Sequence, residues 1–176
     1  MHEGLEGQEA HAVEPWTLPV AVTMSILTVL VAMATLLGHR AATEKLLLQT
    51  RATDQWAYYQ AKNIRLHEMQ SAADMLGLLA PADKEKAAAM REKYLKEVER
   101  YQDDKDEITN KAKELESEGA HISRREDRFD VAEVILEIGL IICSLTLITR
   151  KKIFWYSGIA LGVVGFLVAL TGFFVP

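Results

Sequence analysis

The chain has 176 residues and a formal net charge of −5, with 26% charged and 49% hydrophobic residues. All but three of the 20 Lys and Arg lie between Arg40 and Arg128, and the remaining three stand together at 150–152. Basic and acidic residues alternate in the central stretch, so no basic patch favours binding to nucleic acid. The single cysteine, Cys143, excludes a disulfide framework and a cysteine-based zinc site within one chain.

Residues 1–15 are expected to form an acidic tail. The tail contains four glutamates and no Lys or Arg: Glu3, Glu6, Glu9 and Glu14. The uncharged run at 16–38 then exceeds the roughly 20 apolar residues that a transmembrane helix needs. Trp16 fits an interfacial anchor for this first transmembrane helix. Because the preceding region is acidic and the apolar run is long, a cleaved signal peptide is not expected.

Residues 39–122 are predicted to form a helical hairpin outside the bilayer. The first helix, 39–80, carries apolar or long side chains at the 3-4 spacing of a coiled coil: Leu48, Ala52, Gln55, Tyr59, Lys62, Leu66, Met69, Ala73, Leu76 and Ala80. Pro81 suits the start of a second helix, 82–117, with the same spacing: Ala87, Arg91, Tyr94, Val98, Tyr101, Lys105, Ile108, Ala112 and Leu115. At 1.5 Å per residue the two helices are roughly 60 Å and 54 Å long, so their lengths match.

Antiparallel packing of these two helices is expected to bring Tyr59 near Tyr101 and Ala73 near Ala87. The tip of the hairpin would then lie at 80–83. The same two seams would also pair between chains, and the sequence leaves this alternative open.

A second helix break is predicted before the chain returns to the membrane. Gly119 suits a helix stop, and the run from Ser123 to Glu126 is a capping box that starts a new helix. This helix, 123–149, is expected to enter the bilayer as the second transmembrane helix. A basic turn at 150–153 precedes the third, at 154–174.

The orientation in the membrane is ambiguous from the sequence. Three spans place the N-terminal tail and the 150–152 turn on one side, and the hairpin and C-terminus on the other. Basic residues near the span ends are more numerous on the hairpin side, which favours a cytoplasmic hairpin. The positive-inside rule is nevertheless strongest for short turns such as 150–152. A slight preference remains for a cytoplasmic hairpin.

Three segments carry a resemblance to a known family: the run TDQWAYYQAK from Thr53 to Lys62, the stretch from Arg100 to Glu116, and the triplet at 128–130. They resemble an uncharacterised bacterial membrane family, catalogued as domain of unknown function 4337. The resemblance covers nearly the whole chain and implies a multi-pass protein of the bacterial inner (plasma) membrane with this architecture. It carries over no activity, cofactor or catalytic residue.

Four carboxylates at 4-3-4 spacing share one face of the helix that enters the second span: Glu126, Asp130, Glu133 and Glu137. Carboxylates inside a bilayer are costly unless they are paired, protonated or exposed to water, so this intramembrane acidic face is a candidate functional site. Arg40, at the end of the first span on the same side, is the proposed ion-pair partner of Glu137 or Glu133. The alternatives are a site that handles protons or cations and simple solvation at the interface.

Two stripes of small residues are candidates for helix packing, because small side chains let helices approach closely in lipid. The stripe in the third span consists of Gly158, Gly162, Gly165, Ala169 and Gly172. The stripe in the first span consists of Ala21, Ser25, Thr28, Ala32 and Thr35. The stripes either pack together within one chain or form a seam between copies.

Aromatic residues at helical spacing in the hairpin are expected to contribute to packing rather than to bind a ligand: Trp56, Tyr59, Tyr94 and Tyr101. The five histidines are too scattered along the chain to predict a metal site. No cofactor is expected.

The sequence therefore predicts an all-α integral membrane protein with three transmembrane helices and a long extramembrane antiparallel coiled-coil hairpin between the first and second. It contains no nucleotide-binding loop, zinc-hydrolase motif or nucleophile elbow, and two thin helices offer no concave pocket for a substrate. We expect a non-enzymatic scaffold or interaction protein whose partners are the lipid bilayer and further copies of itself or other membrane-complex subunits. The alternative is a small oligomeric channel or transport component that uses Glu133 and Glu137.

Overall fold

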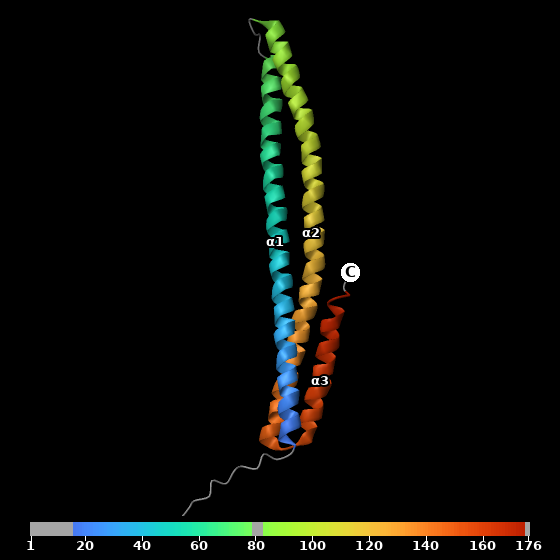
Figure 1. Cartoon of the computed structure of the whole chain (residues 1–176). Coiled ribbons are helices and arrows are strands. Elements are labelled where there is room, and N and C mark those ends of the chain that lie inside the picture. The colour runs from blue at the N-terminus through green and yellow to red at the C-terminus, as the bar shows by residue number, and fades with distance from the viewer. Residues whose placement is uncertain (1–15, 79–82, 175–176) are drawn as a thin grey trace, which may run out of the picture. The chain divides into compact units, whose positions relative to one another are not determined.

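The computed structural model describes residues 16–78 and 83–174, and these form three α-helices (Figure 1). The helices are α1 (Thr17–Leu78), α2 (Lys84–Thr149) and α3 (Lys152–Thr171). The protein is therefore all-α, and α1 and α2 pack against each other as a hairpin. The chain divides into two compact units, which we call the three-helix unit (residues 1–41 and 124–176) and the hairpin unit (residues 42–123).

Each of the three helices contains a segment long and apolar enough to cross a membrane. In α1 this segment lies near the N-terminus. Because α1 has 62 residues and α2 has 66, each continues well beyond the roughly 20 residues that a bilayer requires. The apolar segments are referred to below as candidate spans.

The helix break expected near Gly119 is wrong, because α2 is continuous from Lys84 to Thr149. The run from Ser123 to Glu126 is therefore helix interior and does not act as a capping box. A single glycine inside a helix costs only about 1 kcal/mol, and the flanking residues are mostly good helix formers. Gly119 is buried instead, opposite Leu48 of α1.

Helix boundaries near the tip of the hairpin also differ slightly from expectation. The expected second helix begins at residue 82, whereas α2 begins at Lys84. Asp83 caps it, because the backbone N–H of Lys86 donates to Asp83 Oδ1 at 3.1 Å. Pro81 lies outside the described residues. At the other end of the chain, α3 begins at Lys152, two residues before the expected start of the third span.

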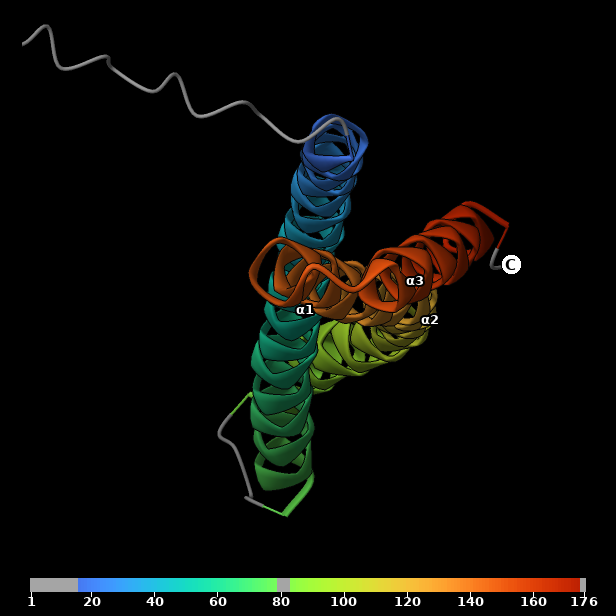
Figure 2. The same ribbon diagram turned by 90° about the horizontal axis from the view of Figure 1, so that it is seen from below.

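The core of the three-helix unit is formed by side chains from all three helices. Figure 2 shows these helices from below. The buried residues of this core are Leu27 and Ala34 of α1 and Leu136 and Cys143 of α2. Partly buried side chains from all three helices pack around them: Met24, Leu30, Val31, Leu140 and Trp155. The buried positions of α1 recur every seventh residue, from Val20 through Leu27 and Ala34, as expected for helices that share a long interface.

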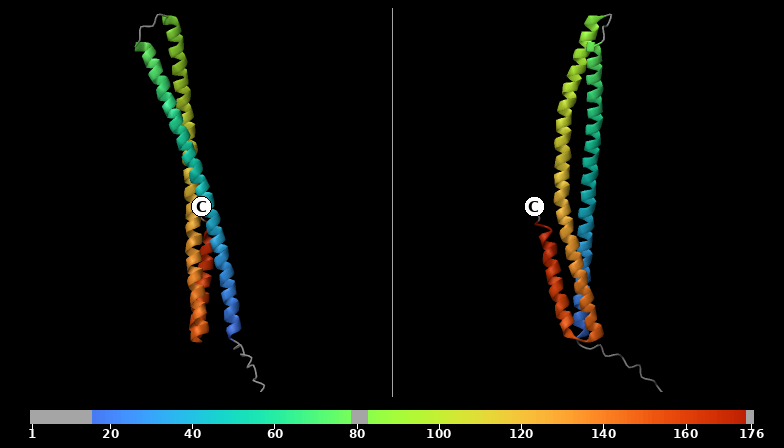
Figure 3. Two further views of the ribbon diagram at one scale, coloured as in Figure 1. Left: turned by 90° about the vertical axis from the view of Figure 1, so that its left-hand side faces the viewer. Right: turned by 180° about the vertical axis from the view of Figure 1, so that it is seen from behind.

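In the hairpin unit α1 and α2 lie side by side and antiparallel (Figures 1 and 3). The buried residues of this unit all belong to the two predicted seams, apart from Gly119: Leu48, Ala52, Leu66, Ala73, Tyr101, Ile108, Ala112 and Leu115. Leu48, Ala52 and Leu115 form an apolar cluster, against which Ile122 packs. The sequence therefore identified the packed faces correctly.

The register of the hairpin differs from the expected pairing by about one heptad, because Leu48 lies opposite Gly119, whereas the expected pairing would place it opposite Ala112. The Lys105 ammonium lies 5.0 Å from the centre of the Tyr59 ring, and the Lys62 ammonium lies 5.0 Å from that of Tyr101. Tyr59 thus faces the end of the Lys105 side chain, and Tyr101 faces the end of the Lys62 side chain, whereas the sequence predicted that the two tyrosines face each other. A 3-4 pattern repeats every heptad, so it specifies the packed face but not which turns meet.

A disulfide between residues 48 and 119 tests this register. A Cβ atom added at Gly119 would lie 3.7 Å from the Leu48 Cβ, within the 3.5–4.5 Å range typical of disulfides. In a Cys143→Ala background, Leu48→Cys with Gly119→Cys should therefore oxidise to an intramolecular disulfide, which faster migration on non-reducing gels would detect. Leu48→Cys with Lys113→Cys is the control, because residue 113 is exposed and about 9 Å further along α2. Equal crosslinking of both pairs would contradict the register.

Candidate functional site

The four carboxylates of the predicted acidic face all lie on α2 in the three-helix unit, but they have different surroundings. Asp130 and Glu137 are exposed, whereas Glu126 and Glu133 are half-buried. Glu133 has a direct partner on α1, because its Oε1 lies 2.6 Å from the Thr35 hydroxyl. Glu133 is therefore linked directly to the neighbouring helix α1.

The Thr35 hydroxyl has two neighbouring acceptors. It lies 2.6 Å from Glu133 Oε1 and 3.0 Å from the carbonyl oxygen of Val31. A threonine hydroxyl has a single proton, so it donates to one of these oxygens at a time. Thr35 belongs to the predicted stripe of small packing residues, and its role as the partner of Glu133 was not predicted, because the acidic spacing suggests a cation as the partner.

The proposed ion pair between Arg40 and the acidic face is not formed among the described residues. Arg40 and Glu137 are both exposed, and no salt bridge joins Arg40 to Glu137 or Glu133. The reason is positional. Glu137 follows the buried Leu136 directly, so its side chain leaves α2 about 100° away from the packed face.

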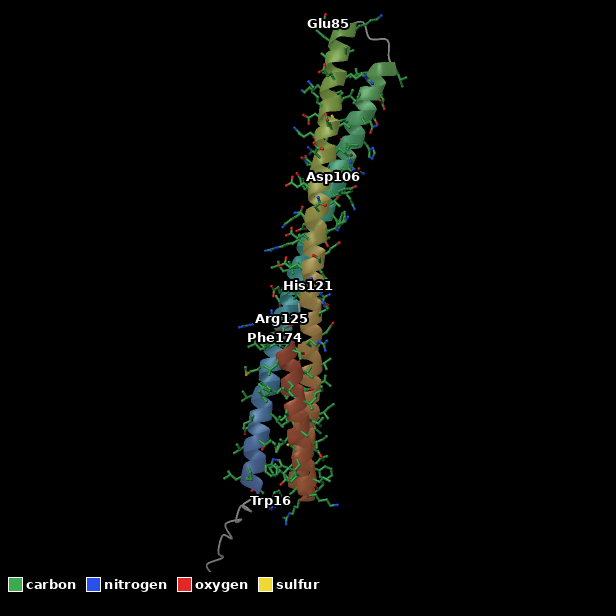
Figure 4. The ribbon with its side chains drawn as sticks, turned by 90° about the vertical axis from the view of Figure 1, so that its right-hand side faces the viewer. Trp16, Glu85, Asp106, His121, Arg125 and Phe174 are labelled. Carbon is green, nitrogen blue, oxygen red and sulfur yellow. The ribbon has the colours of Figure 1, made fainter. Side chains whose placement is uncertain are left out.

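A different arginine makes close contacts in this unit. The Arg125 guanidinium lies 5.8 Å from the centre of the Phe129 ring and 5.7 Å from that of Phe173. The two rings pack edge to face, with their centres 5.5 Å apart. These contacts tie the C-terminal end of the described chain to α2, and Figure 4 shows Arg125 and Phe174 at the same end of the unit. Arg125 and Phe129 are four residues apart, so their contact could be predicted from the sequence. The contact of Arg125 with Phe173 depends on how α3 packs against α2.

The glycine stripe of the third span is used for packing inside the chain. Gly158, Gly162, Gly165 and Gly172 are all buried, and Ala169 is half-buried. Each glycine accommodates a large or close neighbour. A Cβ atom would meet Leu27 of α1 at Gly162, and on α2 it would meet Cys143 at Gly158, Leu136 at Gly165 and Phe129 at Gly172.

The small-residue stripe of the first span does not pack against the glycine stripe of the third span. Ala21, Ser25, Thr28 and Ala32 are exposed. The hydroxyls of Ser25 and Thr28 bond to carbonyl oxygens one turn earlier in α1. The two stripes therefore do not pack together in this chain, and the stripe of α1 faces outward apart from Thr35, which contacts Glu133 of α2.

The hairpin unit contains a polar layer between its two helices. Lys62 Nζ donates to Asp104 at 2.5 Å, and Lys105 Nζ donates to Asn63 at 2.8 Å. The pKa of Lys62 is raised, chiefly because of this hydrogen bond to Asp104. Lysine ammonium groups stacked on tyrosine rings add to the layer, which makes register errors costly because a shifted hairpin would leave these groups unpaired.

Two of the predicted packing aromatics of the hairpin, Tyr59 and Tyr101, lie in this layer. Tyr101 is buried, and Trp56, Tyr59 and Tyr94 are half-buried. The Trp56 and Tyr59 rings pack edge to face at 5.7 Å, and Trp56 Nε1 donates to Glu116 at 2.8 Å. Trp56, Tyr59 and Tyr101 thus make contacts within or between the two helices.

No group of three or more His, Cys, Asp or Glu side chains within residues 16–78 and 83–174 is arranged to hold a metal ion. The carboxylate–hydroxyl contact between Glu133 and Thr35 pairs α2 with α1. The chemistry available here is hydrogen bonding and charge, which is consistent with a packing site.

A substitution at Gly158 tests the contact between α2 and α3. A Cβ atom there would lie 2.3 Å from Cys143 Sγ and 2.8 Å from the Gly139 carbonyl oxygen. Gly158→Ala should therefore lower the free energy of unfolding in detergent by about 1–3 kcal/mol, the usual cost of overpacking. Ala160→Leu on the exposed side of α3 is the control and should have little effect. If both variants lowered the free energy of unfolding by the same small amount, α3 would not pack through Gly158.

Double-mutant cycles distinguish the two pairings of the acidic face. Thr35→Ala and Glu133→Ala should couple by about 0.5–3 kcal/mol in the free energy of unfolding, because the two side chains are in contact. Arg40→Ala and Glu137→Gln should add within about 0.3–0.5 kcal/mol, as expected for residues that share no contact. Strong coupling in the second cycle would instead restore the ion pair proposed from the sequence.

Comparison with known proteins places the chain in a family. The model of a domain of unknown function (DUF4337) matches residues 16–175. No curated protein and no solved structure matches the chain. The family match begins at Trp16, directly before α1, and extends over all three helices. The chain therefore belongs to the DUF4337 family.

Proposed function

We propose that this protein is a non-enzymatic membrane scaffold whose hairpin unit associates with a second copy of the chain. One observation carries the proposal: the hairpin exposes an apolar face of α1 that the intramolecular packing does not use. The face contains Ile64, Met75 and Leu78, which are 59%, 60% and 86% exposed. Exposed apolar side chains that share a face are typical of interaction surfaces.

The geometry of this face suits a helical partner. A shallow groove runs along it, lined by Ile64, His67, Glu68, Ser71, Ala72 and Met75. Ile64, Ser71, Met75 and Leu78 follow 7-4-3 spacing, which places them on one stripe of α1. The intramolecular seam runs through Leu66 and Ala73 on another side of the same helix. A helix with two such seams can pack against more than one neighbour.

The charge of this helix is compatible with self-association. Residues 42–78 of α1 contain four basic and four acidic side chains: Lys45, Arg51, Lys62, Arg65, Glu44, Asp54, Glu68 and Asp74. Two copies of a neutral segment do not repel each other, so apolar contacts decide the association. An accessory subunit of a larger complex would use the same face for a different chain.

The proposed location is the membrane, because all three helices contain candidate spans. The bacterial plasma membrane is the compartment that the family resemblance implies. We further propose that the hairpin is an antiparallel coiled coil outside the bilayer, from the 3-4 spacing of its buried residues. The slight preference for a cytoplasmic hairpin stays part of the proposal.

Charged substitutions on the exposed face test self-association. Ile64→Glu with Met75→Glu should shift the protein–detergent complex to a lower oligomer mass, because the carboxylates would be buried against the partner. Light scattering coupled to size-exclusion chromatography measures this mass. Gln60→Glu with Gln70→Glu adds the same charge to other exposed positions of α1 and should leave the mass unchanged.

A monomeric wild-type protein would contradict self-association. If that monomer co-purified with another membrane protein in mild detergent, and the Ile64→Glu and Met75→Glu variant lost this partner, the accessory-subunit form of the scaffold would be favoured. An oligomer that is insensitive to both variants would place the interface elsewhere.

A channel or transport component is the second candidate, and it is favoured by the exposure of Glu137 on the apolar part of α2. An exposed carboxylate at this position suits a water-filled path between copies. Ion flux in reconstituted vesicles that Glu137→Gln abolishes, with the oligomer intact, would favour this function over the scaffold.

A further inference from the structure

Arg125 of α2 lies beside the C-terminal end of α3, and Arg128 follows it on the same side of α2. Arg125 is half-buried against the rings of Phe129 and Phe173, whereas Arg128 is exposed. Residues three apart are neighbours on the surface of a helix. The two guanidinium groups are therefore close enough to contact one ligand together.

The N–H donors of Arg125 and Arg128 are not used inside the chain. Within residues 16–78 and 83–174, neither side chain forms a salt bridge or a hydrogen bond. The phenylalanine rings attract the Arg125 cation, but they contain no oxygen that could accept its five N–H donors. The last backbone carbonyls of α3 already accept from the N–H groups that follow the helix: those of Ala169, Leu170 and Thr171.

Carboxylates in the same stretch of α2 face other directions. Successive residues are rotated by about 100° around a helix axis, which places Glu126, Asp127 and Asp130 at least about 100° away from each of the two arginines. The parts of α1 and α3 in the three-helix unit contain no Asp or Glu. The side of α2 that bears Arg125 and Arg128 is therefore locally basic.

This basic side of α2 lies at the level expected for lipid headgroups. α3 has 20 residues, which gives a length of about 30 Å, the thickness of the hydrocarbon core. Trp155 near its start suits one surface of the bilayer, so its end, where Phe173 contacts Arg125, suits the other. Figure 4 shows Arg125 and Phe174 near each other at the end of the unit opposite Trp16.

We propose that Arg125 and Arg128 bind the phosphate group of an anionic phospholipid. Guanidinium groups form paired, charge-assisted hydrogen bonds with phosphate oxygens, and the two rings hold Arg125 in place for this contact. A zwitterionic lipid carries its own cation beside the phosphate, so the anionic lipid is favoured. The inference rests on the proposed membrane location, but it does not depend on self-association or on which side the hairpin faces.

Lipid retention in native mass spectrometry tests the proposal on the full chain. The protein in neutral detergent is supplied with equal amounts of phosphatidylglycerol and phosphatidylcholine, and the retained lipids are counted. Wild type should retain phosphatidylglycerol preferentially, and more weakly as salt rises. R128Q should lower this preference roughly fivefold, and R125Q/R128Q should lower it roughly 30-fold.

Matched variants separate the site from general charge and from misfolding. R65Q/R91Q removes two exposed arginines of the hairpin unit and should keep the preference. Because Arg125 also packs against two rings, its replacement can destabilise the chain, and R128Q at an exposed position then decides the test. A wild type without preference, an unchanged preference in R128Q, or an equal loss in R65Q/R91Q would overturn the proposal.

Two further measurements separate the competing explanations. If millimolar inorganic phosphate displaces the retained lipid from wild type, the ligand is free phosphate and the lipid proposal is overturned; continued retention supports it. Alkaline extraction of wild-type membranes tests the location on which the inference rests. Release of the protein contradicts the membrane location itself, whereas retention in the membrane without a lipid preference contradicts only the lipid site. The oligomer mass in the same spectra reports on self-association independently.

Discussion

Close approach of α3 to its neighbours at glycine is the constraint on which the three-helix unit depends. Between helices in lipid there is little hydrophobic driving force, so association rests on close packing and a few hydrogen bonds. At Gly158 the backbone of α3 comes so near to Gly139 and Cys143 that no side chain fits. Gly162 and Gly165 receive Leu27 and Leu136 in the same way. Large side chains of α1 and α2 thus fill notches in α3.

The hairpin unit achieves specificity by a different means. Its buried apolar side chains are few, because each helix presents a narrow seam and many charged residues to solvent. The polar layer at Lys62 and Asp104 is partly shielded, with side chains 17% and 33% exposed. Such a layer contributes more to register than to stability, since a shifted pairing would leave buried polar groups without partners. The apolar cluster around Leu48 supplies the complementary non-polar contact.

Features that repeat along the sequence were predictable, and features that require two specific residues to meet were not. The apolar runs gave three helices with candidate spans, and the 3-4 spacing identified Leu66, Ala73 and Ile108 as buried. Continuity of α2 through Gly119 was missed, because a glycine and a capping sequence are weak signals beside the packing of a long helix.

The candidate site shows the same limit. Its acidic face was found from spacing alone, but the partner of Glu133 is the hydroxyl of Thr35 rather than the guanidinium of Arg40. Helical periodicity places side chains on a face of one helix and says nothing about the rotation of the neighbouring helix. The contact of Arg125 with Phe173 was missed for the same reason, because Arg125 lies inside α2 and Phe173 follows the end of α3.

The notch at Gly158 also has an evolutionary consequence. Because the thiol of Cys143 occupies the space that a side chain at position 158 would need, the two positions share one small volume. A larger residue at either position requires a smaller one at the other. Position 158 is already glycine, the smallest residue, so it cannot become smaller to accommodate a larger residue at position 143. Cys143 is therefore held below a maximum size by its neighbour, independently of any reactivity of its sulfur. The pair therefore fits this site only if its combined volume stays small.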